Sequence, residues 1–256
     1  MVNAPQIVVR RLERLVNIEP QEGWALFWSF SYFFALLCSY YIVRPLRDEM
    51  GVAGGVENLQ WLFTGTFLVM LAAIPVFGWL TSRYRRSQFL PAIYIFFIVN
   101  LLGFYSLFQS DIEHIYVARA FFIWTSVFNL FVVSVFWSFM TDLYSDAQAR
   151  RLFGFIAAGG TAGAITGPAL TTTLALPLGP TSLLIVSAIF LGWALLAIQR
   201  LIKWSAKTKH EESKQDNATE DKLNKPLGGS VLAGIRLVFQ SPYLMGIAIL
   251  MLLYTT

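Results

Sequence analysis

The sequence has few of the residues that build reaction centres or hold metals. Only 13% of its 256 residues are charged, against about 25% in a typical soluble domain. The single cysteine, Cys38, has no partner for an internal disulfide and no second thiol for a metal site. The two histidines, His114 and His210, lie far apart in polar segments, which excludes a shared metal site with Cys38. We therefore predict neither a metal nor a cofactor.

Catalytic motifs are missing as well. Residues 159–163 read Gly-Gly-Thr-Ala-Gly, but no lysine follows them and no strand precedes them, so they are not a phosphate-binding loop. A hydrolase embedded in a membrane would need ionisable pairs or metal ligands within its apolar runs, and we find none. The basic residues stand in short clusters between apolar runs, which is typical of membrane topology rather than of nucleic-acid binding. We predict neither an enzyme nor a nucleic-acid-binding protein.

Hydrophobic residues, in contrast, make up 56% of the chain and occur in long runs. A membrane-spanning helix needs roughly 20 mostly apolar residues in succession. Six runs meet this length: 24–43, 59–80, 89–109, 115–140, 152–174 and 181–202. Because loops inside lipid would leave backbone groups without hydrogen bonds, these runs should be helices. The predicted fold class is an all-α membrane protein, a six-transmembrane-helix bundle.

The chain divides into four predicted segments. Residues 1–23 are a cytoplasmic amphipathic segment, whose helix over 4–16 either lies along the membrane or is an ordinary solvated helix. Residues 24–202 form the six-helix bundle, and 203–230 are a polar cytoplasmic linker. Residues 231–256 hold a short amphipathic helix and the start of a seventh transmembrane helix. Because that run is too short to span, we expect a fragment or a truncated reading frame.

The distribution of lysine and arginine predicts the orientation. Basic residues collect before the first run, after the second, after the fourth and after the sixth: Arg10, Arg11 and Arg14; Arg83, Arg85 and Arg86; Arg150 and Arg151; Arg200, Lys203 and Lys207. The opposite loops hold only Arg44 and Arg47. Cytoplasmic loops carry the excess of basic residues. We therefore place the N-terminus and the linker in the cytoplasm.

Polar residues gather at the end of the first run. Arg47 and Asp48 follow Arg44 by three and four residues, so all three can share a helix face, and Tyr40 lies one turn before Arg44. One reading is an interfacial anchor in which Asp48 pairs with Arg44. The other is an anion site facing a central cavity, because a guanidinium binds phosphate or carboxylate through two hydrogen bonds. A second polar group, Asp142 with the Arg150–Arg151 pair, is predicted to be a salt bridge or gate latch.

Glycines mark the fifth run. Gly159, Gly163 and Gly167 recur every four residues and so lie on one helix face, where a neighbouring helix can approach closely. Pro168 follows and removes a backbone donor, which favours a kink. The stripe is either simple tight packing or a bendable interface that rocks during transport.

The spacing of Gly154, Gly163, Gly167 and Pro168 resembles the helix-five antiporter motif of the major facilitator superfamily, with Thr171 and Thr172 in place of its closing glycines. The loop after the second run resembles that superfamily's loop 2–3 signature, although Ser82 and Arg85 depart from it. Its matching residues are Gly78, Leu80, Arg83 and Arg86. Arg119 stands where the superfamily often has an arginine. This resemblance implies half of a 12-helix fold that needs a second six-helix half.

Three segments resemble the ATP/ADP translocase family of bacteria and plastids: 41–48, 136–142 and 149–154. This resemblance implies alternating-access transport of a small molecule, with antiport of an organic anion such as a nucleotide. The implied substrate-binding residues are Arg44, Arg47, Arg119 and Tyr40. The residues expected to serve gating or packing are Asp48, Gly78, Arg83, Arg86, Asp142, Gly154, Gly159, Gly163, Gly167 and Pro168. Transport of uncharged or cationic metabolites or drugs, and a non-transporting membrane interaction protein, remain the alternatives.

Overall fold

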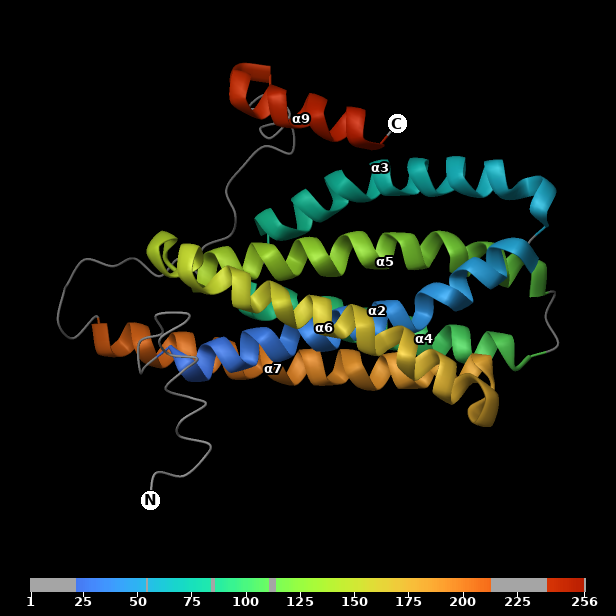
Figure 1. The fold of residues 1–256 in the computed structure, drawn as a ribbon, viewed down its shortest axis with the longest axis horizontal. Helices are drawn as coiled ribbons and strands as arrows, with labels where there is room; N and C mark the ends of the chain where they lie inside the picture. The colour runs from blue at the N-terminus through green and yellow to red at the C-terminus, as the bar shows by residue number, and fades with distance from the viewer. Residues whose placement is uncertain (1–21, 54, 84–85, 111–113, 213–238, 256) are drawn as a thin grey trace.

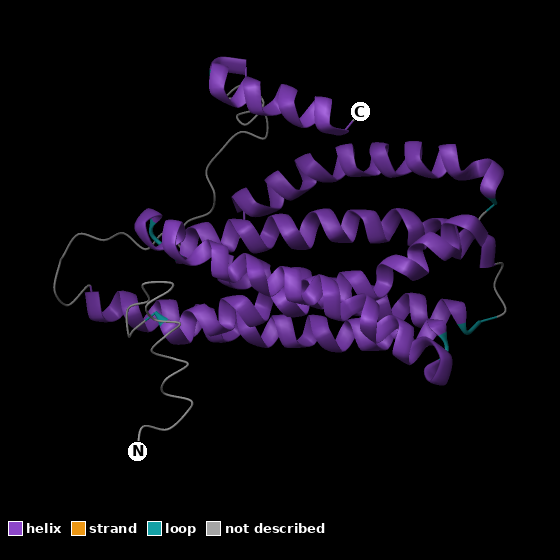
Figure 2. Ribbon diagram, in the orientation of Figure 1, coloured by secondary structure: helices purple, strands orange, loops and turns teal. Residues whose placement is uncertain are grey.

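The computed structural model describes residues 22–53, 55–83, 86–110, 114–212 and 239–255, and every regular element within these ranges is a helix (Figure 2). Six helices are long and apolar enough to cross a membrane. They are α2 (Gly23–Ala53), α3 (Leu59–Arg83), α4 (Arg86–Phe108), α5 (His114–Leu143), α6 (Asp146–Leu178) and α7 (Leu183–Glu212). The shorter helices are η1 (Val56–Asn58), η2 (Pro180–Ser182) and α9 (Pro242–Thr255). The predicted all-α membrane fold is confirmed.

The six long helices run side by side, and successive helices point in opposite directions (Figure 1). Helix α2 lies in the middle and packs against α5, α6 and α7, whereas α3 packs mainly against α5. The starts of α2, α4 and α6 therefore lie at one end of the bundle with the ends of α3, α5 and α7. We call this the N-terminal end of α2. The opposite end, where α2 stops and α5 begins, is the C-terminal end of α2.

Aromatic side chains and a few polar ties hold α2 in the core. The Phe33 ring of α2 stacks on Phe136 of α5, with the ring centroids 4.1 Å apart. The hydroxyls of Ser39 in α2 and Ser187 in α7 lie 2.7 Å apart, and both residues are fully buried. Buried hydroxyls need such partners in an apolar environment. The buried hydroxyl of Ser39 therefore ties α2 to α7.

The long helices extend beyond the apolar runs that predicted them, and α2, α6 and α7 extend farthest. Helix α2 continues past Pro45 to Ala53, and α7 continues to Glu212, so residues 203–212 of the predicted linker are helical. Helix α6 begins at Asp146 because the Ser145 side chain accepts a hydrogen bond from the Gln148 backbone in a capping box. Hydropathy predicts where a helix leaves the apolar part of the membrane, not where the helix ends. The backbone hydrogen bonds of these helices continue into the polar residues that follow or precede each apolar run.

Some predictions lie outside the described residues. These include the amphipathic helix over 4–16 and the rest of the linker from 213 to 230. Helix α9 occupies the predicted seventh apolar run with 14 residues, fewer than the roughly 20 that span a bilayer.

Candidate functional site

At the C-terminal end of α2 the structure brings two of the predicted arginines to the start of α5. The Arg47 guanidinium carbon lies 5.2 Å from the centre of the Phe122 ring of α5. Arg119 precedes Phe122 by one turn of the same helix, and its Nη2 lies 4.0 Å from the position of a Cβ built on Gly55. Both arginines therefore stand where α5 begins, beside the loop that joins α2 to α3.

Arg44 occupies a different strip of α2. Its guanidinium carbon lies 5.6 Å from the centre of the Tyr41 ring, and the side chain is exposed. Tyr41 packs on the α6 side of α2, because a Cβ on Gly167 of α6 would meet the Tyr41 Cβ at 2.7 Å. Arg47 packs on the α5 side. Arg44 lies between these two contact surfaces, on the face of α2 that neither α5 nor α6 covers.

The ion pair in this cluster differs from the predicted one. Arg47, rather than Arg44, donates to Asp48: Nη2 and Nε lie 2.6 and 2.9 Å from Asp48 Oδ1. Helical side chains lean toward the N-terminus, and Arg44 accordingly lies over Tyr41, away from Asp48. The Arg47 side chain is 20% exposed, whereas that of Asp48 is 55% exposed. The charge of Arg47 is thus partly balanced, and the pairing of Arg44 with Asp48 is wrong.

Tyr40 does not lie on the open strip of α2, which is the face around Arg44 that neither α5 nor α6 covers. It is 7% exposed and belongs to the main hydrophobic core, with its ring centre 5.2 Å from that of Tyr41. In this structure the Tyr40 ring contacts the Tyr41 ring, and the Tyr41 ring contacts the Arg44 guanidinium. The ring that touches a candidate ligand-binding arginine is therefore Tyr41, which spacing alone did not single out.

The glycine stripe of α6 faces α2 directly. A Cβ on Gly159 would lie 2.5 Å from the Phe30 carbonyl oxygen, and one on Gly163 would overlap the Phe34 carbonyl oxygen. Gly160, which the four-residue spacing missed, is also buried, but a Cβ on it would overlap the Phe33 ring rather than backbone. Any side chain here would push the two backbones apart. In this structure the stripe is a close contact within the six-helix bundle.

Other members of the predicted helix-five motif lie off this contact. Gly154 is exposed, and nothing lies within 4 Å of a Cβ built on it, so it makes no close helix contact here. Pro168 is half-buried inside α6, which continues to Leu178. Thr171, in place of a motif glycine, extends the contact because its hydroxyl donates to the Ile42 carbonyl at 3.3 Å.

The N-terminal end of α2 is tied to α6 by an ion pair that the sequence did not suggest. Arg151 Nη2 lies 2.9 Å from Glu22 Oε1, and Gln148 Nε2 donates to the same oxygen at 2.8 Å. The Glu22 side chain is only 3% exposed. One residue before the cap of α6, the Tyr144 hydroxyl lies 2.9 Å from Ser29 Oγ. Burial raises the pKa of the Tyr144 hydroxyl by more than the hydrogen bond with Ser29 lowers it.

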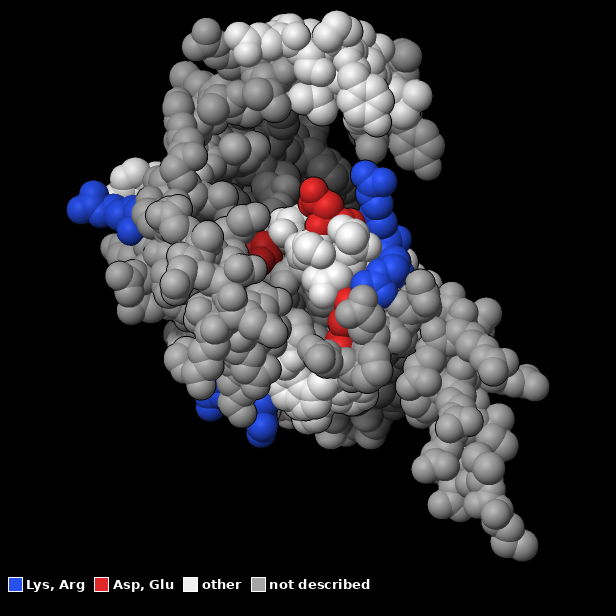
Figure 3. Space-filling model, turned by 90° about the vertical axis from the view of Figure 1, so that its left-hand side faces the viewer, with Lys and Arg blue, Asp and Glu red and all other residues white. Residues whose placement is uncertain are grey.

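The remaining predicted gating residues also lie at this end. Asp142 is half-buried at the end of α5, and Gly78 lies in the last turns of α3. Arg83 is exposed with its guanidinium carbon 5.6 Å from the Trp79 ring centre, and Arg86 is the first residue of α4. In Figure 3, which views this end of the bundle, the described acidic side chains lie toward the centre and the basic ones around the edge.

The fold and these contacts define a polytopic α-helical membrane protein built around one central helix. The sequence model of the Major Facilitator Superfamily matches residues 23–256. The chain therefore belongs to that superfamily and is a secondary transporter of the major facilitator type. No curated protein and no solved structure gives a match.

Proposed function

We propose that the protein exchanges an organic anion, such as a nucleotide, across a bacterial inner membrane by alternating access. The observation that carries this proposal is the exposed Arg44, which stands between the α5-facing and α6-facing surfaces of α2. Arg47 and Arg119 add positive charge on the α5 side of the same end. A charge at such a position costs free energy in a membrane and is usually kept for function.

The chemistry of arginine supports an anionic cargo. A guanidinium keeps its charge when it is partly desolvated, and its planar donors match the oxygens of a phosphate or carboxylate. Asp48 balances part of the charge of Arg47. Tyr41 holds Arg44 through its ring and leaves the guanidinium donors available. Arg44 is therefore the proposed principal ligand, with Arg47 and Arg119 as supporting charges.

The cargo class rests on the resemblance of residues 41–48, 136–142 and 149–154 to the ATP/ADP translocases. Transporters of this kind bind their substrates between two six-helix halves near the middle of the bilayer. We propose that a second half completes the cavity that the open strip of α2 borders. The excess of basic residues at the N-terminal end of α2 favours placing that end in the cytoplasm, which puts Arg44 toward the outside.

Exchange of radiolabelled nucleotides and other organic phosphates tests this function, with the chain expressed together with any sequence that continues it after Thr256. Loss of one charged hydrogen bond at Arg44→Gln should raise the KM about tenfold, roughly 1.4 kcal/mol. Arg47→Gln should raise the KM less, because Asp48 already shares its charge. Asp146→Asn is the control, since Asp146 is exposed at the opposite end. If Arg44→Gln and Arg47→Gln both exchange the native substrate at wild-type rates and KM, the arginines are membrane anchors.

A further inference from the structure

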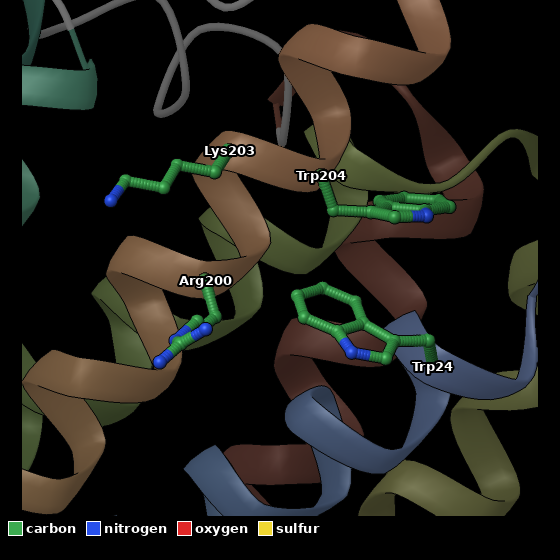
Figure 4. A pocket seen from close by; sticks show the side chains of 4 residues that line it. All are labelled: Trp24, Arg200, Lys203 and Trp204. Atoms are coloured by element: carbon green, nitrogen blue, oxygen red, sulfur yellow. The ribbon is translucent and has the colours of Figure 1, made fainter.

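A second group of cations and aromatic rings lies at the N-terminal end of α2. A pocket of about 300 Å³ opens between the start of α2 and the end of α7, lined by Trp24, Arg200, Lys203 and Trp204. In Figure 4 the two indole rings lie one above the other, and the Arg200 and Lys203 side chains extend from α7 toward the same side. The proposed transport function makes no use of these four residues.

The Arg200 side of the pocket is ordered by stacked aromatic rings. The Arg200 guanidinium carbon lies 5.9 Å from the centre of the Trp28 ring, within the range of a cation–π contact. Trp28 in turn stacks on Trp193, with the ring centres 6.2 Å apart. The Trp193 Nε1 donates to Ser31 Oγ at 2.7 Å, which fixes that indole. Arg200 is thereby oriented while its hydrogen-bond donors stay available.

The positive charge of this pocket is not balanced by the described part of the chain. Within residues 22–53, 55–83, 86–110, 114–212 and 239–255, no carboxylate forms an ion pair with Arg200 or Lys203. Two adjacent cations that form no ion pair with a carboxylate favour the binding of an anionic ligand. The tryptophans place the pocket at the level of the headgroups, where indole rings concentrate in membrane proteins.

An apolar stripe leads from this pocket toward the middle of the membrane. Ile189, Trp193 and Leu196 lie on the same face of α7 as Arg200 and Lys203, since all five are spaced by three or four residues. Ile189 is 67% exposed, Trp193 47% and Leu196 51%. From Ile189 to Arg200 the helix rises about 16 Å, close to half the ~30 Å hydrocarbon thickness of a bilayer. The stripe thus matches one acyl chain in length and polarity.

The pocket does not share the open face that holds Arg44. Trp24 and Arg44 are 20 residues apart on one helix, which at 3.6 residues per turn puts them about 160° apart around α2. Trp24 is next to the exposed stripe of α7, whereas Arg44 lies between α5 and α6. The pocket therefore opens on the lipid-facing side of the bundle.

We propose that this pocket binds the headgroup phosphate of an anionic phospholipid, with one acyl chain along Ile189, Trp193 and Leu196. Basic pockets between transmembrane helices are suited to such headgroups. A free phosphate ion carries the same charged group as the headgroup, but it has no acyl chain to contact the apolar stripe. The site is independent of the cargo and rests on residues away from the proposed substrate site.

Native mass spectrometry of the full chain, purified in detergent, tests the site by titration with phosphatidylglycerol, phosphatidylcholine or inorganic phosphate. We expect phosphatidylglycerol to be retained and phosphatidylcholine to be lost. Arg200→Gln and Lys203→Gln should each weaken retention about fivefold, since each basic residue near a membrane surface contributes on the order of one such factor. The Leu196→Asn variant should weaken it too, because it interrupts the apolar stripe. Arg150→Gln, a second exposed arginine at this end, should retain the lipid fully.

Circular dichroism and gel filtration check that each variant is folded, and Arg200→Lys should restore part of the retention by returning the charge. The proposal is overturned if phosphatidylcholine is retained as well as phosphatidylglycerol. It is equally overturned if the folded double variant Arg200→Gln/Lys203→Gln keeps phosphatidylglycerol, or if millimolar inorganic phosphate displaces the lipid.

Discussion

Helices α2 and α3 are both apolar enough to cross a membrane, but the bundle uses them differently. In the most hydrophobic 18-residue stretch of each, 61% of the α2 residues are buried inside the protein, against 11% of the α3 residues. Helix α2 is held by glycines, stacked rings and paired hydroxyls, whereas α3 presents rings such as Trp61 and Phe67 to its surroundings. Hydrophobicity places a helix in the membrane, and specific contacts decide whether it packs in the centre of the bundle or stays exposed at its edge.

Truncating a buried ring that packs on α2 and an exposed ring of α3 should give the largest contrast. Phe136, which stacks on α2, is fully buried, while Phe67 of α3 is 64% exposed. Phe136→Ala should lower the free energy of unfolding by about 4 kcal/mol, because it leaves a cavity. Phe67→Ala should change it by less than about 0.5 kcal/mol. Unfolding in mixed detergent micelles measures both, and equal losses would mean that α2 is no more central than α3.

A smaller effect is expected from the glycine contact that keeps α2 close to α6. Gly163→Ala puts a Cβ against the Phe34 carbonyl oxygen, where backbone has little room to move, and should cost about 2 kcal/mol. Gly154→Ala, in the same helix with nothing near its Cβ, should stabilise the protein by about 0.5 kcal/mol. The same unfolding assay compares them. If the two substitutions behave alike, the glycine spacing does not set the distance between the helices.

The Glu22–Arg151 pair should give the smallest of the three effects. Arg151→Gln removes a charged partner from a nearly buried carboxylate and should cost about 1.5 kcal/mol. Arg150→Gln, next to it and exposed, should stay within about 0.5 kcal/mol. A double-mutant cycle with Glu22→Gln isolates the pair energy. A coupling energy near zero would show that the start of α2 is held without this contact.

Much of the fold was predictable from the sequence because spanning helices must be long and apolar. The six runs gave the number, order and type of the long helices. Their ends were less accurate where the chain turns polar, as at Asp146, where a cap starts α6, and after Val43, where α2 continues. Residue hydropathy carries no information about caps or about polar turns that extend a helix into the interface.

For the candidate site, helical spacing predicted which residues share a face of one helix, but it did not predict their contacts. Spacing put Gly159, Gly163 and Gly167 on one face, and α2 packs there. It did not reveal the partner of Arg151, because Glu22 lies 129 residues away in the sequence. It also paired Asp48 with Arg44 instead of Arg47, since the partner depends on the direction in which each side chain leans.

The proposed mechanism depends most directly on water reaching Arg44 from the outside. Cys38 is the only cysteine in the sequence and is fully buried, so a cysteine introduced elsewhere can be labelled against a silent background. A membrane-impermeant maleimide applied to intact cells should label Arg44→Cys. It should label Arg150→Cys only after the membrane is permeabilised. Labelling of Arg150→Cys but not of Arg44→Cys in intact cells would contradict both the orientation and the outward-facing site.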